Sequence, residues 1–268
     1  MAARIFFPHL LCLIIGVCLG FSLQAQVLGL RQPPSPEQQR QMKIRLQEEL
    51  KNADSDTLRV RLKMQIAGLT VQGNTTEALQ LAKEALALAE KTNHTETIAR
   101  AYFGAANIQM RSNRYDDALQ YLNDGLPAAE KLENPDLLSN YYNQFGQIYQ
   151  ERGVYEKALA YYRKANDALQ KTAAPPIRKA GVLNQIGMIL HKTGKHRDAA
   201  SYLEKAGTMA EQARIWDMAD GIWNNLANCH DALNEPQEAE AARAKSRACV
   251  EQNKKKAMAP ASIKSGSN

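Results

Sequence analysis

The sequence predicts an all-α fold in which five helix hairpins stack into a solenoid behind an N-terminal capping helix. Three observations predict it: small residues recur every 40 or 41 positions, glycine or asparagine recurs at a fixed phase, and apolar residues within units recur at helical spacing. The chain has 268 residues, of which 44% are hydrophobic, and its mean hydropathy is −0.46. This composition allows a sizeable core and excludes a polytopic membrane protein.

The repeat is visible when five segments, which include EKALAYYRKA at 156–165, are aligned at this period. Small residues let neighbouring helices approach closely, and glycine or asparagine at a turn accepts a left-handed backbone. Because a single hairpin cannot bury its apolar face, we expect stability to come from stacked neighbours. The four columns, in which only Ile66 is large, are Ala78, Ala118, Ala158, Ala199 and Ala239; Ala85, Gly125, Ala165, Ala206 and Ser246; Gly73, Asn113, Gly153, Gly194 and Asn234; and Ile66, Ala106, Gly146, Gly187 and Ala227.

The columns place two helices in every repeat. An additional helix is expected at 36–52, where Ser35, Pro36 and Gln38 form a capping-box pattern, and it should cover the exposed face of the first hairpin. The expected array covers 59–252, with repeats starting near 59, 99, 139, 180 and 220, and its helix pairs are 59–72 with 75–91, 98–112 with 115–131, 138–152 with 155–171, 179–193 with 196–213, and 219–233 with 236–252.

One expected helix contains residues that oppose helix formation. Gly125 and Pro127 lie inside the second helix of the second repeat. An interior proline costs about 3 kcal/mol and removes a backbone hydrogen bond. We therefore expect a kink or break near 123–127.

The pattern N-Q-F-G-x-x-Y-x-x-x-G-x-Y-x-x-A-x-x-x-Y-x-x-A at 143–165 resembles a tetratricopeptide repeat. That repeat usually has about 34 residues, and the present one is about six longer. The longer unit resembles the branch found in kinesin light chain, Rap-type bacterial regulators and sensor regions of bacterial kinases. The resemblance implies a right-handed α-solenoid that binds protein or peptide partners along a concave face lined by the first helices. It is specific for fold and weak for function.

The same resemblance implies a peptide-binding groove. In kinesin light chain and its relatives, asparagines at this phase line the groove, and an amide offers donors and an acceptor to an extended main chain. The alternative is that these amides are solvated or bridge neighbouring repeats. The candidate groove residues are Asn143, Asn184 and Asn224, then Asn107, Gln147 and Asn228 one turn further, and Arg100, Arg111, Gln150, His191 and Asp231 further along the face.

Nothing in the sequence indicates catalysis. H-E-x-x-H, G-x-S-x-G, P-loop and C-x-x-C motifs are absent, and His191 and His196 are separated by an expected turn that should keep them off a common helical face. We therefore expect a non-enzymatic protein with no metal site and no cofactor.

Cys229 and Cys249 are expected to be unpaired. In an antiparallel hairpin they would be offset by about 14 Å along the helix axis, whereas a disulfide needs Cα atoms within about 7 Å. We therefore expect two free, inert thiols.

The two ends of the chain differ from its middle: the amino-terminal end is apolar and the carboxy-terminal end is rich in lysine. Residues 1–25 have one base, an apolar stretch and small residues before Ala25, which is typical of a signal peptide followed by a linker at 26–35. An uncleaved membrane anchor and a lipoprotein acylated at Cys18 are the alternatives. Residues 253–268 are expected to form a disordered, lysine-rich tail that could touch an anionic membrane surface weakly.

These observations together favour an exported, periplasmic or extracellular interaction scaffold. The formal charge is +6, but the lysine-rich end accounts for most of it, so a nucleic-acid partner is not expected. The alternatives are a regulatory subunit that acts through a separate kinase or transcription factor, and an assembly factor for an envelope complex.

Overall fold

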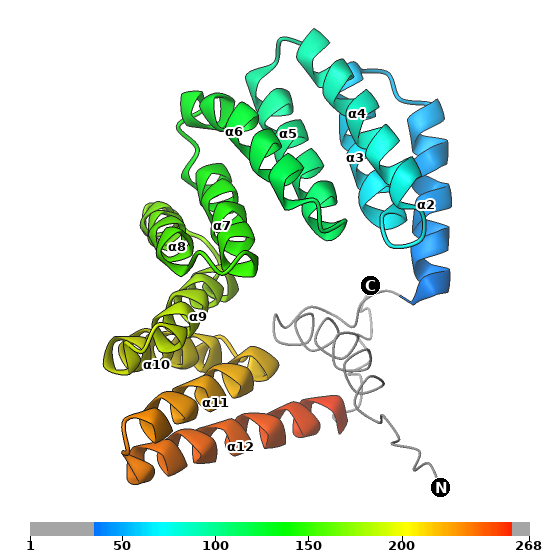
Figure 1. The fold of residues 1–268 in the computed structure, drawn as a ribbon. Helices are drawn as coiled ribbons and strands as arrows, with labels where there is room; N and C mark the ends of the chain where they lie inside the picture. The colour runs from blue at the N-terminus through cyan, green and yellow to red at the C-terminus, as the bar shows by residue number, and fades with distance from the viewer. Residues whose placement is uncertain (1–34, 259–268) are drawn as a thin grey trace, which may run out of the picture. The chain divides into compact units, whose positions relative to one another are not determined.

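The computed structural model describes residues 35–258, which contain eleven α-helices and no strand (Figure 1). The expected signal peptide and most of the expected linker lie outside these residues. The described residues belong to two compact units, one ending at Ile189 and the other beginning at Leu190. The predicted all-α architecture of stacked helix hairpins is confirmed.

The unit that ends at Ile189 contains one leading helix and three complete hairpins. Consecutive helices of a hairpin pack against each other, as do the leading helix α2 and α3. The helices are α2 (Pro36–Lys51), α3 (Asp56–Thr70), α4 (Thr75–Lys91), α5 (Thr95–Arg111), α6 (Tyr115–Lys131), α7 (Pro135–Glu151), α8 (Tyr155–Gln170) and most of α9 (Pro176–Lys192).

The unit that begins at Leu190 contains the end of α9 and three further helices, α10 (His196–Gln212), α11 (Trp216–Ala232) and α12 (Pro236–Met258). α10 packs on α11 and α11 packs on α12. Cys229 and Cys249 are buried free thiols, as the register predicted, and burial raises the pKa of each to about 11.

The turns within hairpins largely follow the predicted column. Asn113, Gly153, Gly194 and Asn234 all have positive φ, between 57° and 79°. Gly73 does not share this conformation; its turn is closed by a hydrogen bond from the Asn74 amide to the Thr70 carbonyl, at 2.8 Å. The asparagines and glycines therefore mark the turn positions because they tolerate the left-handed region.

The N-terminal cap forms as the sequence predicts. The Ser35 hydroxyl accepts a hydrogen bond from the Gln38 amide, and the Gln38 side chain accepts one from the Ser35 amide. α2 packs on α3, and Lys43 of α2 forms a 3.0 Å ion pair with Glu77 of α4. The leading helix therefore covers one side of the first hairpin.

Of the kink or break expected near 123–127, the break is wrong, because α6 continues from Tyr115 to Lys131. Pro127 lacks the N–H that would bond the Asn123 carbonyl, but both residues lie on the exposed side of the helix. Water can solvate a carbonyl freed at such a position. The buried side carries Gly125, where an added Cβ would lie 2.3 Å from the Tyr141 hydroxyl oxygen. Glycine is therefore required at this position by close packing, and it does not end the helix.

The expected disordered tail also needs correction. α12 extends through Met258 and includes three of the lysines assigned to that tail, at 254–256. The Asn253 side chain donates a hydrogen bond to the Asp217 carboxylate of α11, which anchors the last turns to the neighbouring helix.

Within residues 35–258, none of the helices combines the length and the apolar character needed to cross a membrane.

Candidate functional site

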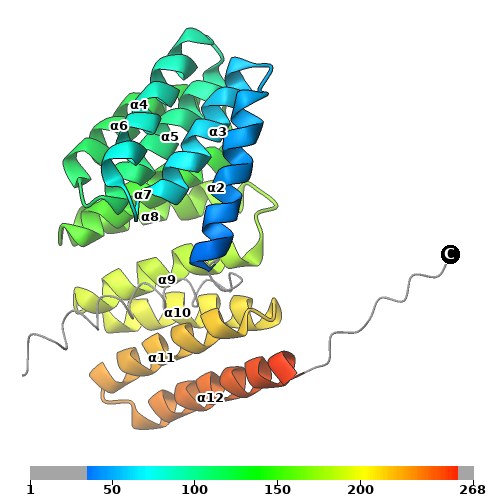
Figure 2. The same ribbon diagram turned by 90° about the vertical axis from the view of Figure 1, so that its right-hand side faces the viewer.

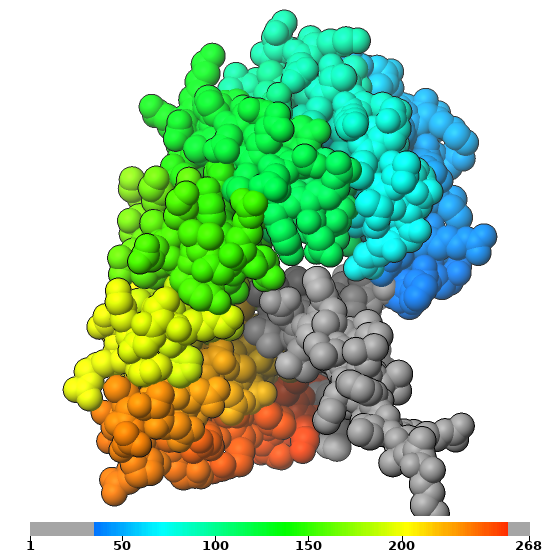
Figure 3. Space-filling view, in the orientation of Figure 1, coloured from blue at the N-terminus to red at the C-terminus, as the bar shows by residue number. Residues whose placement is uncertain are grey.

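In the unit that ends at Ile189, the first helices of consecutive hairpins lie next to one another. α3 contacts α5, and α5 contacts α7, whereas the second helices of the described hairpins approach one another less closely. Figure 2 shows the helices of this unit from a second side. In the space-filling view, the cyan-to-green face of this unit, which includes α4 and α6, is a continuous surface (Figure 3). The first helices therefore form the inner layer, and the second helices form the outer layer.

Three candidate groove residues on this inner layer form no side-chain hydrogen bond within the described chain. Asn107 on α5 and Asn143 and Gln147 on α7 are half-buried, and none of them hydrogen-bonds another residue of the described chain. Their amide groups are therefore available to an external hydrogen-bonding partner.

The same helices contain buried amides whose hydrogen bonds are incomplete. Both polar atoms of Gln144 lack a partner within the described residues, although only 4% of its surface is exposed. The side-chain oxygens of Gln109 on α5 and Gln185 on α9 also lack one there. Burying an unsatisfied amide costs about 1–3 kcal/mol, so the inner layer has hydrogen-bonding capacity that the fold does not use.

Other candidate residues of this unit are already engaged within the chain. Arg111 donates to the Gly68 carbonyl at 2.6 Å, and Arg100 forms a 2.8 Å ion pair with Glu96. Gln150 accepts a 2.9 Å hydrogen bond from the Tyr162 hydroxyl. These side chains support the repeat packing. Asn184 lies in the same unit, and its amide nitrogen is 3.5 Å from the Met188 sulfur.

The remaining candidates belong to the unit that begins at Leu190. Asn224 donates to Asp220 at 3.0 Å, and Asp231 accepts a hydrogen bond from Arg243 of α12. Asn228 is exposed and forms no hydrogen bond within the described chain. Of the asparagine series, the structure therefore brings Asn107, Asn143 and Gln147 onto adjacent helices.

His191 and His196 lie on different helices with a turn between them, as expected, but their rings are in contact, which the sequence did not predict. The turn at Gly194 folds the start of α10 back onto α9, so the two Nδ1 atoms lie 3.1 Å apart. Cys229 of α11 places its Sγ 3.2 Å from the same nitrogen of His191. Burial and the neighbouring His196 lower the pKa of His191, which favours the neutral ring. The His191 ring therefore contacts side chains of two other helices and is already engaged within the chain.

Across residues 35–258, no group of three or more histidine, cysteine or acidic side chains is arranged to hold a metal ion.

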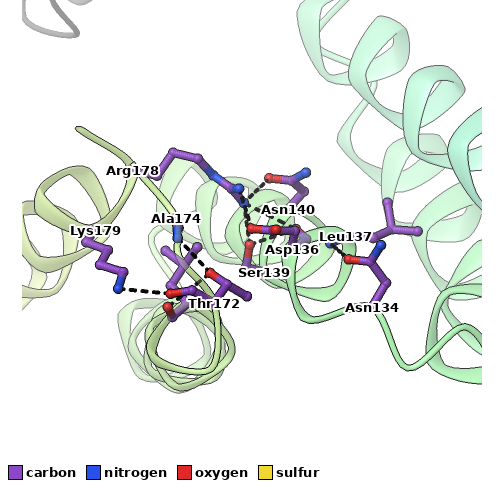
Figure 4. A network of polar contacts seen from close by, with 10 residues as sticks. Asn134, Asp136, Leu137, Ser139, Asn140, Thr172, Ala174, Arg178 and Lys179 are labelled. Atoms are coloured by element: carbon purple, nitrogen blue, oxygen red, sulfur yellow. Dashed lines mark hydrogen bonds and ion pairs between the residues drawn. The ribbon is translucent and has the colours of Figure 1, made fainter. Parts of the chain in front are cut away.

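A polar network fixes the spacing of two inner helices (Figure 4). Arg178 at the start of α9 donates to the Asp136 carboxylate at 2.6 Å, the Ser139 hydroxyl at 2.6 Å and the Asn140 side chain at 2.9 Å, all on α7. Lys179 donates to the Thr172 carbonyl at 3.2 Å. These contacts lie near the amino-terminal ends of α7 and α9 and leave Asn143 and Gln147 uninvolved.

Sequence reasoning missed two adjoining cavities at the other end of this layer. One, of about 800 Å³, lies between α3 and α5, and the other, of about 640 Å³, lies between α2, α3 and the end of α5. Arg61 and Gln65 of α3 line both. Gly68, which falls outside the four columns and lines the second cavity, was the available sequence signal for open space on α3.

The model of the tetratricopeptide repeat family matches the chain over residues 67–131, 98–171 and 136–212. No curated protein matches its sequence.

Solved structures share the fold at low identity. BtubC (BKLC) from P. vanneervenii superimposes with a TM-score of 0.72 at 21% identity, covering 88% of this chain and 98% of that one. A putative kinesin light chain with nearly identical TPR-like repeats from Podospora anserina gives 0.62 at 18% identity, covering 76% and 100%. A Rap protein complexed with competence and sporulation factor gives 0.53 at 15% identity, covering 79% and 68%. With the family model matching more than half of its length and its hairpins stacking as in these structures, the chain belongs to the tetratricopeptide repeat family.

Proposed function

We propose that this protein is a non-enzymatic scaffold that binds an extended or helical segment of a partner protein along the inner helices α3, α5 and α7. Tetratricopeptide repeats are typically interaction scaffolds, and the repeat surface offers a long face for this purpose. The observation that carries the proposal is the set of uncommitted, half-buried amides at Asn107, Asn143 and Gln147.

The spacing of these amides suits a peptide main chain. Asn143 and Gln147 are four residues apart on one helical face, a rise of about 6 Å. Groups on the same side of an extended chain recur every two residues, or about 6.6 Å. An amide donates and accepts, so each side chain can pair with one backbone group of the ligand in either direction.

A partner-capture experiment tests the proposal. We expect an Asn143→Ala/Gln147→Ala double variant to lose the partner that the unaltered chain retains. Each lost hydrogen bond is worth about 1 kcal/mol, so affinity should fall by at least about tenfold.

The matched control is Gln120→Ala/Asn123→Ala, which removes the same two amide types from exposed positions of the outer helix α6. Circular dichroism should first show that both variants remain helical. Equal retention of the partner by the two double variants would contradict the proposal.

The proposal includes export of the protein by the segment 1–25. Its support is the base at Arg4, the apolar run 10–19 and the small residues Ser22 and Ala25. Amino-terminal sequencing of the protein recovered outside the cytoplasm should begin at Gln26. Recovery of an intact Met1 terminus in the membrane fraction would support the uncleaved anchor instead.

A further inference from the structure

We infer that the cavities beside α3 form a specificity subsite for an acidic peptide, in which one carboxylate pairs with Arg61 and apolar side chains on either side enter the two cavities. This inference rests on the proposed function, because it assigns chemistry to the segment bound by the inner helices. It places selectivity at the α2–α3–α5 end of the layer, away from the amides on α7.

The position of Arg61 between two hollows is the first argument. Arg61 and Gln65 are four residues apart on one face of α3, so they stand side by side along the helix. Both line the cavity of about 800 Å³ and the cavity of about 640 Å³. A ligand that crosses α3 from one cavity to the other must therefore pass the Arg61 guanidinium.

The charge of the two cavities is the second argument. Their carboxylates, Glu96 and Glu49, are already paired with Arg100 at 2.8 Å and Arg45 at 3.0 Å. Arg61 is exposed and forms no ion pair or hydrogen bond with any residue between 35 and 258. The net charge that the subsite presents to a ligand is therefore positive, and a carboxylate is its complement.

Arg111 extends this positive charge to the far end of the second cavity. Its Nη1 donates to the Gly68 carbonyl at 2.6 Å, which holds the guanidinium in place. Partial burial of the guanidinium lowers the pKa of Arg111. Because arginine stays protonated, an additional ligand carboxylate at this end would be favourable.

The floors of the cavities are apolar. Leu58, Val60 and Met64 line the first cavity, and Leu46 and Leu69 line the second. Met42 also lines the second cavity and is 48% exposed, which leaves a large apolar side chain without cover. Burial of a side chain such as leucine or phenylalanine contributes about 1.5–3 kcal/mol, so apolar ligand residues are the fitting occupants.

A peptide-display selection tests the subsite. The probe is a random library of about 12-residue peptides, which span about 40 Å when extended, selected on the immobilised full chain. We expect enriched peptides to carry an aspartate or glutamate between apolar residues. Binding of a synthetic copy of one enriched peptide should weaken as sodium chloride rises from about 50 mM to about 500 mM, because exposed charge pairs are screened.

Charge reversal at Arg61 is the decisive variant. Arg61→Glu should lower the affinity for the selected acidic peptide by at least about tenfold, since attraction between the charges becomes repulsion. Lys83→Glu is the matched control, because Lys83 is exposed on the outer helix α4 and makes the same charge change away from both cavities. The control should bind within about twofold of the unaltered chain.

The outcomes separate this inference from the proposed function. Enriched peptides that are basic or uncharged, or acidic peptides that bind Arg61→Glu normally, overturn the acidic subsite. If those peptides still bind the Asn143→Ala/Gln147→Ala variant more weakly, the proposal that the inner helices bind a peptide remains supported. A library from which nothing is enriched counts against both proposals.

Discussion

Gly146 illustrates how a single residue sets the distance between two helices. An added Cβ there would lie 2.7 Å from the ring of Tyr162, and that ring is fully buried in the α7–α8 hairpin. Gly104 differs, because its added Cβ would meet the flexible Met64 side chain at 3.2 Å. The same residue type therefore serves two purposes in this array.

We predict that Gly146→Ala lowers the free energy of unfolding by about 1–3 kcal/mol, because overpacking against a rigid ring outweighs the gain in helix propensity. Gly104→Ala is the control and should be neutral or stabilising, since a thioether can move aside. Urea unfolding of both variants measures the difference. Equal stability of the two variants would contradict the packing argument.

His191 is a histidine of the unit that begins at Leu190 whose pKa the fold shifts. Its Nδ1 lies within 3.2 Å of both His196 and Cys229, and the folded state lowers its pKa. The unfolded chain therefore binds more protons once the pH falls below about 6.5. The free energy of unfolding should decrease as the pH drops through this value.

Thermal unfolding at neutral pH and at a pH near 5.5 tests this prediction, with the pH chosen to lie below the ordinary histidine pKa of about 6.5. His191→Gln should show a smaller pH-dependent fall in the unfolding temperature than the unaltered chain. His94→Gln, which alters a histidine at the start of α5, is the control. An identical fall in the His191 variant and the unaltered chain would refute the role of His191.

At the scale of elements, α6 shows that burial pattern decides whether a proline breaks a helix. Leu122, Gly125 and Ala129 face the core, while Asn123 and Pro127 face solvent. The core side retains its packing, so the lost hydrogen bond falls where water can replace it. The helix is therefore held together by tertiary contacts despite an unfavourable local sequence.

We predict that Pro127→Ala stabilises the protein by about 1–3 kcal/mol, because the Asn123 carbonyl regains a donor and the helix loses an unfavourable residue. Pro135→Ala is the control: Pro135 occupies the first turn of α7, where proline is well tolerated, so little change is expected. Chemical denaturation compares the two. A loss of stability in Pro127→Ala would show that the proline serves the fold.

At the scale of the whole molecule, each hairpin contacts mainly its neighbours within its own unit, so stability is distributed along each unit. α2 has no buried residue, whereas α7 buries seven, including Tyr141 and Phe145. The last turns of α12 are also exposed. Opening should therefore begin at the ends of the array.

Hydrogen exchange measured by mass spectrometry tests this gradient. We predict that amides of α2 and of the last turns of α12 exchange fastest among the described helices, and that those of α7 exchange slowest, because local opening costs least where few apolar contacts are lost. Protection of α2 equal to that of α7 would contradict a nearest-neighbour array.

Much of the fold and part of the candidate site were accessible from the sequence. The turns at Asn113, Gly153, Gly194 and Asn234 depend on local backbone preferences, and the small-residue columns depend on contacts that recur in every repeat. The asparagine series was found because it keeps a fixed phase in the repeat, whereas its assignment to a groove came from the family resemblance. The sequence did not show which of these amides are free to bind a ligand. The Asn143 side chain has no hydrogen bond within the described chain and that of Asn224 has one, because their individual neighbours differ.

The sequence by itself determined the repeat length, the all-α architecture, the turn positions and the capping box at Ser35, because these follow from backbone sterics and helical periodicity over a few residues. Only the tertiary structure decided that α6 passes through Pro127, that His191 meets Cys229, and that Arg61 stands unpaired between two cavities. These features join side chains about one repeat apart or depend on which side of a helix faces water, and local preferences carry no information about either.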